Sequence, residues 1–409
     1  MKVTPPRASA RSAWLLVLAS FLVQFFTIGV CFYAFSVYLV SIADTLDVDR
    51  AYVTLAMAAQ IAVSTASGYF VGRLISRTSV RGLMAAGVVL VLIGCVGFVA
   101  LGNLIALFVF YGVLVAAGTA LLGPVPCNAL LVDAFDEDRG KAIGIAQIGA
   151  TAGGAAIAPI AAWLLISVGW QRGMLVLTAA LCLVLIPLIW LLVPRRLGST
   201  SRTIPAPSAS ATSLGPRDAL QEPGFQKIVW IIGLNLAAIV PVTQLMFAHA
   251  SQIVTNAASA SFIVSAMAVC AVCAKPACGF IADHRGVRSG VYLCISLQIL
   301  GLWSIAAAET YTLLAVAAGI FGFGYGGLGP LLALFLGQFY GKARFPAMLG
   351  LIGAATTPFN LIGLPFASWV FSVTGSYRPA FLAFLVLSAF STWLFWSLRD
   401  RPAPGVEAT

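Results

Sequence analysis

One ionisable side chain, Lys275, lies deep inside an apolar stretch that is long enough to cross a bilayer. In a helix it stands about 12 Å before Asp283, where the apolar stretch ends. An ammonium group at such a depth costs a few kcal/mol unless water or an anion surrounds it. Lys275 is therefore expected to face a water-filled cavity and to attract an anion. The alternative is a lysine whose stem reaches back to the headgroups.

Other polar side chains within the apolar stretches are uncharged. Interhelical hydrogen bonds use the same residue types as solute binding, so helix packing stays an equal alternative for each of them. Tyr33 and Tyr325 stand beside glycines, where their rings are expected to wall a small organic anion and their hydroxyls to donate to it. The amide and hydroxyl residues are Gln24, Thr27, Gln60, Gln147, Asn235, Gln244, Gln298, Thr356, Thr357 and Asn360.

No Asp or Glu lies in the middle of any apolar stretch, which argues against a proton relay built from carboxylates. His249 stands near one end of a stretch and is expected to be a bystander. The eight cysteines all fall in apolar segments and are expected to be small core residues, including the Cys270-x-x-Cys273 pair. We expect no catalytic residue, no metal site and no cofactor, and hence no enzyme.

The composition identifies the solvent in which these residues lie. Of 409 residues, 61% are hydrophobic and 9% are charged, whereas a soluble domain has about 25% charged residues. The net charge of +10 comes from basic residues in short loops, so it does not indicate nucleic-acid binding. The chain is predicted to be an all-α membrane protein.

Apolar windows predict twelve transmembrane helices. The most hydrophilic stretch, 194–227, is rich in Ser, Pro, Ala and Thr and is expected to be a flexible cytoplasmic linker. It separates a six-helix bundle at 1–193 from a second at 228–409, which ends in a short tail. The predicted spans are 13–42, 52–72, 82–101, 104–132, 141–167, 173–193, 228–252, 258–281, 289–308, 311–338, 346–372 and 378–398.

The basic residues predict the orientation, because cytoplasmic loops hold the excess of Lys and Arg. With the N-terminus inside, 19 of the 23 fall in inside segments and three (Arg50, Arg172 and Arg378) fall outside; the remaining one is Lys275. We therefore expect both termini to be cytoplasmic and the chain to be a multi-pass protein of the cell inner membrane.

An internal repeat supports the division into two halves. Gly123-Pro124 precedes Gly-Trp-Gln-Arg at 169–172 by 46 residues, and Gly329-Pro330 precedes Gly-Ser-Tyr-Arg at 375–378 by the same interval. The offset between the two copies is 206 residues. Two parallel repeats of six helices imply a solute site between them at mid-membrane.

These features resemble the major facilitator superfamily over essentially the whole chain. The sequence Gly279-Phe-Ile-Ala-Asp283-His-Arg285-Gly286-Val-Arg288 looks like the family's signature loop. Its counterpart after the second helix has Gly72 where the acid is expected, so the charge lock found in the family should depend on Asp283, Arg285 and Arg288. The alternative for these three is an ordinary solvated helix end.

More narrowly, the chain is similar to the monocarboxylate porter and oxalate/formate exchanger branch. The resemblance lies in Gly29-Val-Cys-Phe-Tyr33, Lys275-Pro276-Ala-Cys-Gly279, Phe321-Gly-Phe-Gly-Tyr325-Gly-Gly-Leu-Gly-Pro330 and Thr374-Gly-Ser-Tyr-Arg378. Relatives usually carry Arg where Lys275 stands. Because helices 1, 4, 7 and 10 line the cavity in this family, the resemblance favours Gln24, Thr27, Asn235, Gln244 and Tyr325 as substrate contacts, with Tyr33 and Asn360 as further candidates.

The leading hypothesis is a monomeric secondary transporter that moves a small organic anion by alternating access, as proton symport or anion exchange. Two alternatives stay open: efflux of a drug-like amphipathic compound, and uptake of a siderophore or another larger solute. A cation exporter is expected to place an acid in the cavity, and the sequence contains none there.

Overall fold

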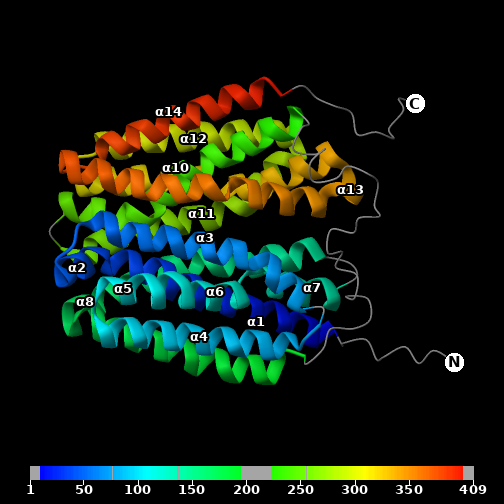
Figure 1. The fold of residues 1–409 in the computed structure, drawn as a ribbon. Coiled ribbons are helices and arrows are strands. Elements are labelled where there is room, and N and C mark those ends of the chain that lie inside the picture. Colours follow the sequence, from blue (N-terminus) through cyan, green and yellow to red (C-terminus); the bar gives the residue numbers. More distant parts are fainter. Residues whose placement is uncertain (1–9, 76, 136–138, 195–222, 255, 399–409) are drawn as a thin grey trace, which may run out of the picture. The chain divides into compact units, whose positions relative to one another are not determined.

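The computed structural model describes residues 10–75, 77–135, 139–194, 223–254 and 256–398, and every element in these ranges is a helix (Figure 1). By its internal contacts the chain divides into two compact units. Unit 1 comprises Met1–Val48 and Ala59–Ala206, and unit 2 comprises Asp49–Ala58 and Pro207–Thr409. The first residues of helix α3 thus group with the second unit, although the rest of that helix belongs to the first.

The first half of the chain contains α1 to α8, with two π-helical segments, η1 and η2, inserted in otherwise α-helical spans. Helices α1 and η1 both pack on α8, and α4 packs on α6, α8 and η2. The bounds are α1 (Ala10–Ile28), η1 (Gly29–Ala34), α2 (Phe35–Leu46), α3 (Arg50–Ile75), α4 (Val80–Leu101), α5 (Leu104–Ala106), η2 (Leu107–Val115), α6 (Ala116–Leu122), α7 (Pro124–Ala134) and α8 (Arg139–Leu192).

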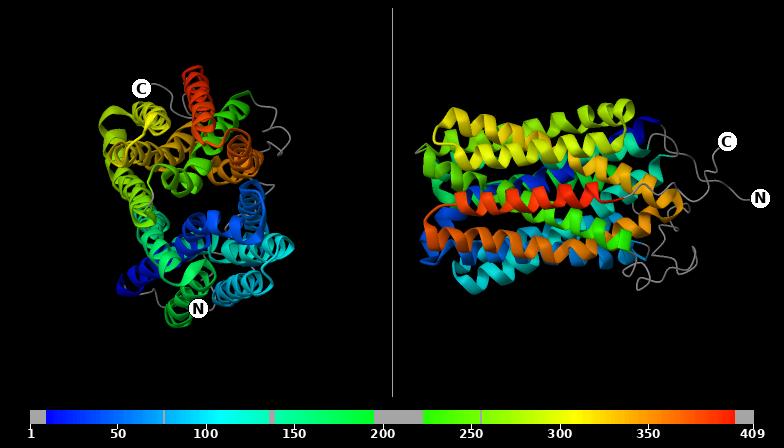
Figure 2. Two further views of the ribbon diagram at one scale, coloured as in Figure 1. Left: turned by 90° about the vertical axis from the view of Figure 1, so that its left-hand side faces the viewer. Right: turned by 90° about the horizontal axis from the view of Figure 1, so that it is seen from above.

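Unit 2 is built mainly from five long helices that bundle side by side (Figure 2). Helix α13 packs against α11, α12 and α10, and α14 packs against α10 and α12. The bounds are α10 (Pro223–Ile253), α11 (Ala257–Arg285), α12 (Val287–Ala307), α13 (Tyr311–Thr374) and α14 (Arg378–Trp396).

Eleven helical stretches in the described residues are long and apolar enough to cross a membrane. One of them, Lys141–Leu192, is 52 residues long and would extend about 78 Å, more than twice the thickness of the hydrocarbon core. It is broken at Gly169, whose φ of 82° and ψ of 165° are not helical. This stretch therefore makes two crossings, which confirms the all-α fold with twelve spans.

The helix ends follow local chemistry. The side chains of Ser79, Asn103, Asn256 and Thr310 each accept a hydrogen bond from a backbone N–H in the first turn of the helix that follows. At the repeated Gly-x-x-Arg motif, Gly375 ends α13 with a φ of 70°. Gly169 and Gly375 are 206 residues apart and both have a positive φ, so the repeat seen in the sequence is also a repeat in backbone geometry.

Three features differ from the expected spans. The end of the expected linker is helical, because α10 begins at Pro223; residues 195–222 of that linker lie outside the described part of the chain. Helix 4 is interrupted at Gly123, an extended residue between α6 and α7, because Pro124 and Pro126 supply no backbone donors there. The corresponding Gly329-Pro330 lies within continuous helix.

Candidate functional site

Helix α11 places Lys275 on the side away from its lipid-exposed stripe. Phe262, Val269 and Phe280 are 56%, 51% and 64% exposed, as expected of large apolar side chains that face lipid. At about 100° per residue, Lys275 lies about 120° around the helix from Val269 and about 140° from Phe280. Ala271, one turn earlier on the side of Lys275, is fully buried. This position favours an interior-facing ammonium over one that reaches the headgroups through lipid.

Helix α13 likewise places Tyr325 on the side away from its exposed residues. Val316 and Leu334 are exposed, and each is nine residues from Tyr325, which is half a turn around the helix. The Tyr325 ring is half-buried and lies against the buried ring of Phe321, with 5.6 Å between centroids. Tyr325 therefore faces away from the exposed side of its helix.

Lys275 and Tyr325 lie in one layer of unit 2, because α11 and α13 pack in close register. A methyl group at Gly326 would clash with the backbone of Ala271, and one at Gly327 would clash with the sulfur of Cys278. Lys275 stands between Ala271 and Cys278 on α11, and Tyr325 adjoins Gly326 on α13. The glycine run of helix 10 thus serves close packing, and this packing brings the cation and the phenol to the same depth.

The two α10 candidates point in opposite directions. Asn235 is buried, and its Nδ2 donates to the Ile231 carbonyl (2.8 Å) and to Ser391 Oγ of α14 (2.5 Å). Its amide therefore joins α10 to α14. Gln244 stands nine residues further along α10, which places it half a turn from Asn235. Gln244 is 7% exposed, and of the two it is the one that does not face α14.

Asn360 lies on α13 where that helix crosses α10. Its neighbours Phe359 and Gly363 pack against Gly233 and the carbonyl of Ala237 of α10. The Asn360 side chain is half-buried, and its Oδ1 atom is buried without a hydrogen-bond partner among the residues that the structure describes.

The unit 1 candidates lie on helix 1. Gln24 and Thr27 are 2% and 1% exposed, and neither Gln24 Nε2 nor Thr27 Oγ1 has a hydrogen-bond partner in the described residues. Tyr33 belongs to η1 and packs on Gly154 of α8, where an added methyl would lie 2.5 Å from its ring. Burial of unpaired donors costs about 1–3 kcal/mol, so Gln24 and Thr27 are candidates for groups that gain a partner in another state.

Of the three gating candidates, the structure describes the side chains of Arg285 and Arg288. The side chain of Asp283 lies outside the described residues, and Arg285 is exposed at the end of α11. Arg288, in the first turn of α12, donates through Nη2 to the Leu398 carbonyl beyond α14 and lies 5.8 Å from the Phe395 ring. These two contacts tie Arg288 to the end of α14 within its own unit.

Unit 1 contains the same arginine contact. Arg81, at the start of α4, donates through Nε to the Val193 carbonyl at 2.6 Å and lies 5.8 Å from the Trp190 ring. Arg81 and Arg288 are 207 residues apart, close to the 206-residue repeat. We call each arginine with its carbonyl and its ring an arginine clamp. A charged donor at a helix C-terminus satisfies a terminal carbonyl and interacts favourably with the helix dipole.

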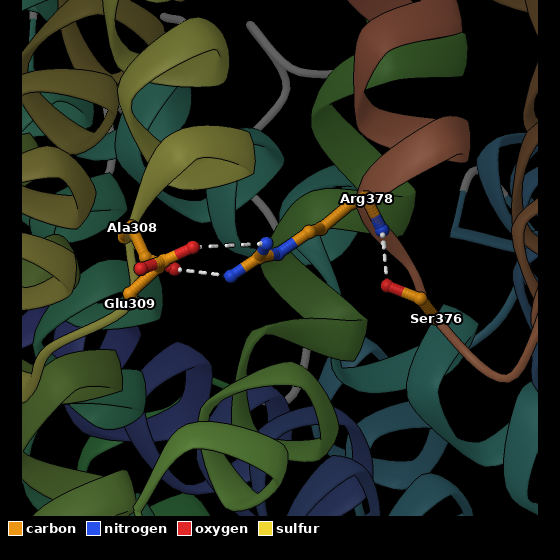
Figure 3. Close-up of polar contacts among 4 residues, drawn as sticks. All are labelled: Ala308, Glu309, Ser376 and Arg378. Carbon is orange, nitrogen blue, oxygen red and sulfur yellow. Dashed lines mark hydrogen bonds and ion pairs between the residues drawn. The ribbon is translucent and has the colours of Figure 1, made fainter.

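At another place in unit 2, Arg378 joins two interhelical loops (Figure 3). Its Nη2 donates to the Ala308 carbonyl at 2.9 Å, and its Nη1 lies 3.7 Å from Glu309 Oε1. The Arg378 backbone N–H donates to Ser376 Oγ at 3.2 Å. Arg378, which the sequence marked only as a loop charge, thus fixes α14 to the α12–α13 connection.

Sequence reasoning did not predict a hydrogen-bonded group in unit 1 centred on the backbone carbonyl of Cys31. Gln60 Nε2 donates to this carbonyl at 3.2 Å, and the Tyr111 hydroxyl donates to it as well. Cys31 lies in η1 and Tyr111 in η2. Gln60 was visible as a polar residue in a span, but nothing in the sequence indicated the π-helical turns that bring these groups together.

Comparisons with known proteins agree with this architecture. The family model of the Major Facilitator Superfamily matches residues 20–255 and 228–409. The chain is 27% identical over 371 residues to monocarboxylate transporter 13 of Rattus norvegicus, which covers 90% of this chain and 85% of the relative. It is 28% identical over 347 residues to monocarboxylate transporter 11 of Mus musculus, covering 82% and 75%.

Among solved structures, a bacterial homolog of the human lysosomal transporter Spinster, in an inward-facing and unoccupied conformation, aligns with a TM-score of 0.75. The alignment covers 97% of this chain and 100% of that one at 16% identity, so it shows a shared fold. The family match identifies the chain as a multi-pass secondary transporter and not an enzyme, and the chain belongs to the Major Facilitator Superfamily.

Proposed function

We propose that this transporter carries a small organic anion, a mono- or dicarboxylate, by alternating access, with Lys275 as the charge partner of the anion. The observation that carries the proposal is the position of Lys275, on the interior side of α11 and in the same layer as Tyr325. A cation at this depth of a membrane protein is commonly part of a substrate or ion path. The similarity to proteins named monocarboxylate transporters supports the same substrate class.

Neutral groups are proposed to complete the recognition of the anion. Tyr325 donates a phenolic hydrogen bond, and Gln244, Gln24 and Thr27 offer further donors on helices 7 and 1. Tyr33 and Asn360 are the remaining candidates. Asn235 is the weakest of the set, because its amide already joins α10 to α14.

Coupling is proposed to occur by proton symport or by anion exchange. Because the sequence places no carboxylate in the middle of a span, the proton would travel on the substrate or through Lys275. A bound carboxylate pairs with the charged ammonium, so binding of the anion and binding of the proton are linked.

The proposals for the gate and for the membrane topology rest on the positions of the charged residues. Asp283, at the end of α11 and among basic residues that include Arg285 and Arg288, would pair when the inner gate is shut. We propose two six-helix halves, 1–193 and 228–409, joined by a cytoplasmic linker at 194–227, in a monomer of the inner membrane with both termini in the cytoplasm.

The topology can be tested with single cysteines at Ser208 and Glu309 in a protein that lacks its eight native cysteines. An impermeant thiol reagent applied to intact cells is expected to label the cysteine at Glu309 and to spare the one at Ser208. Equal labelling of both positions would refute the orientation.

A thermal-shift screen of the purified protein tests the substrate class. A ligand at 100 times its Kd stabilises the folded state by about 2.7 kcal/mol, so a bound mono- or dicarboxylate should raise the Tm clearly. Lys275→Gln should reduce that stabilisation to about 0.4–1.4 kcal/mol, since the Kd is expected to rise ten- to hundred-fold, while Lys227→Gln, which removes a lysine at the start of α10, should preserve it. A screen in which only cationic or large hydrophobic compounds raise the Tm would overturn the proposal.

A further inference from the structure

Helix 1 contains a wide turn that two neighbouring helices hold in place. The segment η1, Gly29–Ala34, is π-helical, whereas the chain before and after it is α-helical. A π-helical turn closes its hydrogen bonds one residue later than an α-helical turn, and such turns inside α-helices often lie at functional sites. The Cys31 carbonyl, inside this turn, accepts hydrogen bonds from Gln60 of α3 and Tyr111 of η2.

The two donors are themselves fixed by burial and by aromatic packing. Gln60 and Tyr111 are both fully buried. The Tyr111 ring stacks on Phe35, with 3.8 Å between centroids, and Phe35 directly follows η1. Helices 2 and 4 therefore hold the wide turn of helix 1 at its carbonyl and at its C-terminal end.

Helix 1 also packs on α8, at a place where α8 carries several glycines. Where helix 1 lies against α8, methyl groups added at Gly149 and Gly153 would clash with the backbones of Phe21 and Phe25. Gly154 leaves room for the ring of Tyr33. The α8 surface is therefore low beside Phe21, Phe25 and Tyr33, whereas the Ile157 side chain of α8 packs against Gly29 at the start of η1.

We infer that η1 is a movable turn that sets the orientation of Tyr33, and that Gln60 and Tyr111 are positioning residues that hold it in the observed register. If the wide turn moves along the helix by one residue, the residue it passes rotates by about 100° while the rest of the helix keeps its packing. Tyr33 lies within η1, so this movement turns its ring toward or away from α8. The role of Tyr33 as a substrate contact rests on the proposed function, whereas the inference of a movable turn does not.

The experiment uses Cys31 as its own reporter. In a full-length protein whose other seven cysteines are replaced by serine, Cys31 is 1% exposed in the observed register and should react slowly with N-ethylmaleimide. Removing one donor with Tyr111→Phe or Gln60→Leu should raise the reaction rate about two- to ten-fold, which corresponds to the loss of one hydrogen bond. The matched control is Tyr38→Phe. Tyr38 is a buried tyrosine in the same span as Cys31, and its hydroxyl has no partner in the described residues.

Transport measurements then separate positioning from simple stabilisation. In proteoliposomes, Tyr111→Phe should change the maximal rate of carboxylate counterflow while its Tm falls only by the small amount that one lost hydrogen bond causes, and Tyr38→Phe should leave that rate unchanged. Unchanged Cys31 alkylation in both donor variants would overturn the movable turn. Faster alkylation with an unchanged maximal rate would overturn its role in transport. If carboxylates are not substrates, counterflow is absent in every variant while the alkylation result still stands.

Discussion

The first helix of each repeat buries polar side chains, but the two halves treat them differently. In α1, Gln24 Nε2 and Thr27 Oγ1 lack partners among the described residues, and the span widens into η1. In α10, Nδ2 of Asn235 donates to Ser391 Oγ, although its Oδ1 lacks a partner among the described residues, and the helix has no π-helical segment. Because unpaired buried donors are unfavourable, we infer that helix 1 can change its contacts, whereas α10 keeps the hydrogen bond from Asn235 to Ser391.

The two units also differ in where a mid-span charge lies and in whether their helices are broken. The mid-span cation Lys275 belongs to unit 2, where α11 and the first span of α13, Tyr311–Tyr340, are unbroken helices that pack closely through glycines. The matching part of unit 1 has the broken helix 4, with η2 and the interruption at Gly123. Unit 2 thus combines the mid-span cation with an unbroken α11, whereas the matching part of unit 1 contains η2 and the break at Gly123.

The largest effect on stability is expected at the arginine clamps, where the two halves are alike. Arg81→Ala and Arg288→Ala should each lower the free energy of unfolding by about 1.5–3 kcal/mol, since each loses a charged hydrogen bond to a helix-terminal carbonyl. Thermal or denaturant unfolding of the purified protein measures this. Arg285→Ala, at an exposed position, should stay within about 0.5 kcal/mol. A loss confined to one clamp would mean that the repeat does not extend to this contact.

A smaller effect, of opposite sign in the two halves, is expected at the buried amides. Asn235→Leu should destabilise the fold by about 0.6 kcal/mol, a typical value for a hydrogen bond between membrane helices, and leave carboxylate affinity unchanged. Gln24→Leu removes an unpaired donor, so it should preserve or raise the Tm while weakening the carboxylate-induced shift. If Asn235→Leu weakens the shift and Gln24→Leu does not, the roles of the two helices are reversed.

Much of the fold follows from the sequence, because lipid requires long apolar helices and turns require particular residues. Positive φ at Gly169 and Gly375 appears where the repeated motif placed the breaks. The wide turn at η1 could not be predicted, because it depends on donors from Gln60 and Tyr111 on other helices. The sequence also could not show that Asn235 faces α14, or that Arg288 donates to the carbonyl of Leu398 beyond α14, because both contacts depend on tertiary partners.

The central claim is that Lys275 binds the anion, and counterflow in proteoliposomes tests it most directly. Losing a hydrogen bond to a charged group costs about 1.5–3 kcal/mol, so Lys275→Gln should raise the half-saturating carboxylate concentration about ten- to hundred-fold. Lys275→Arg keeps the charge but changes its shape, so it should retain part of the activity with altered substrate preference. Lys227→Gln, reconstituted at the same density, should match the unmodified protein. A Lys275→Gln protein that reconstitutes well and exchanges the carboxylate with unchanged half-saturation would contradict the account.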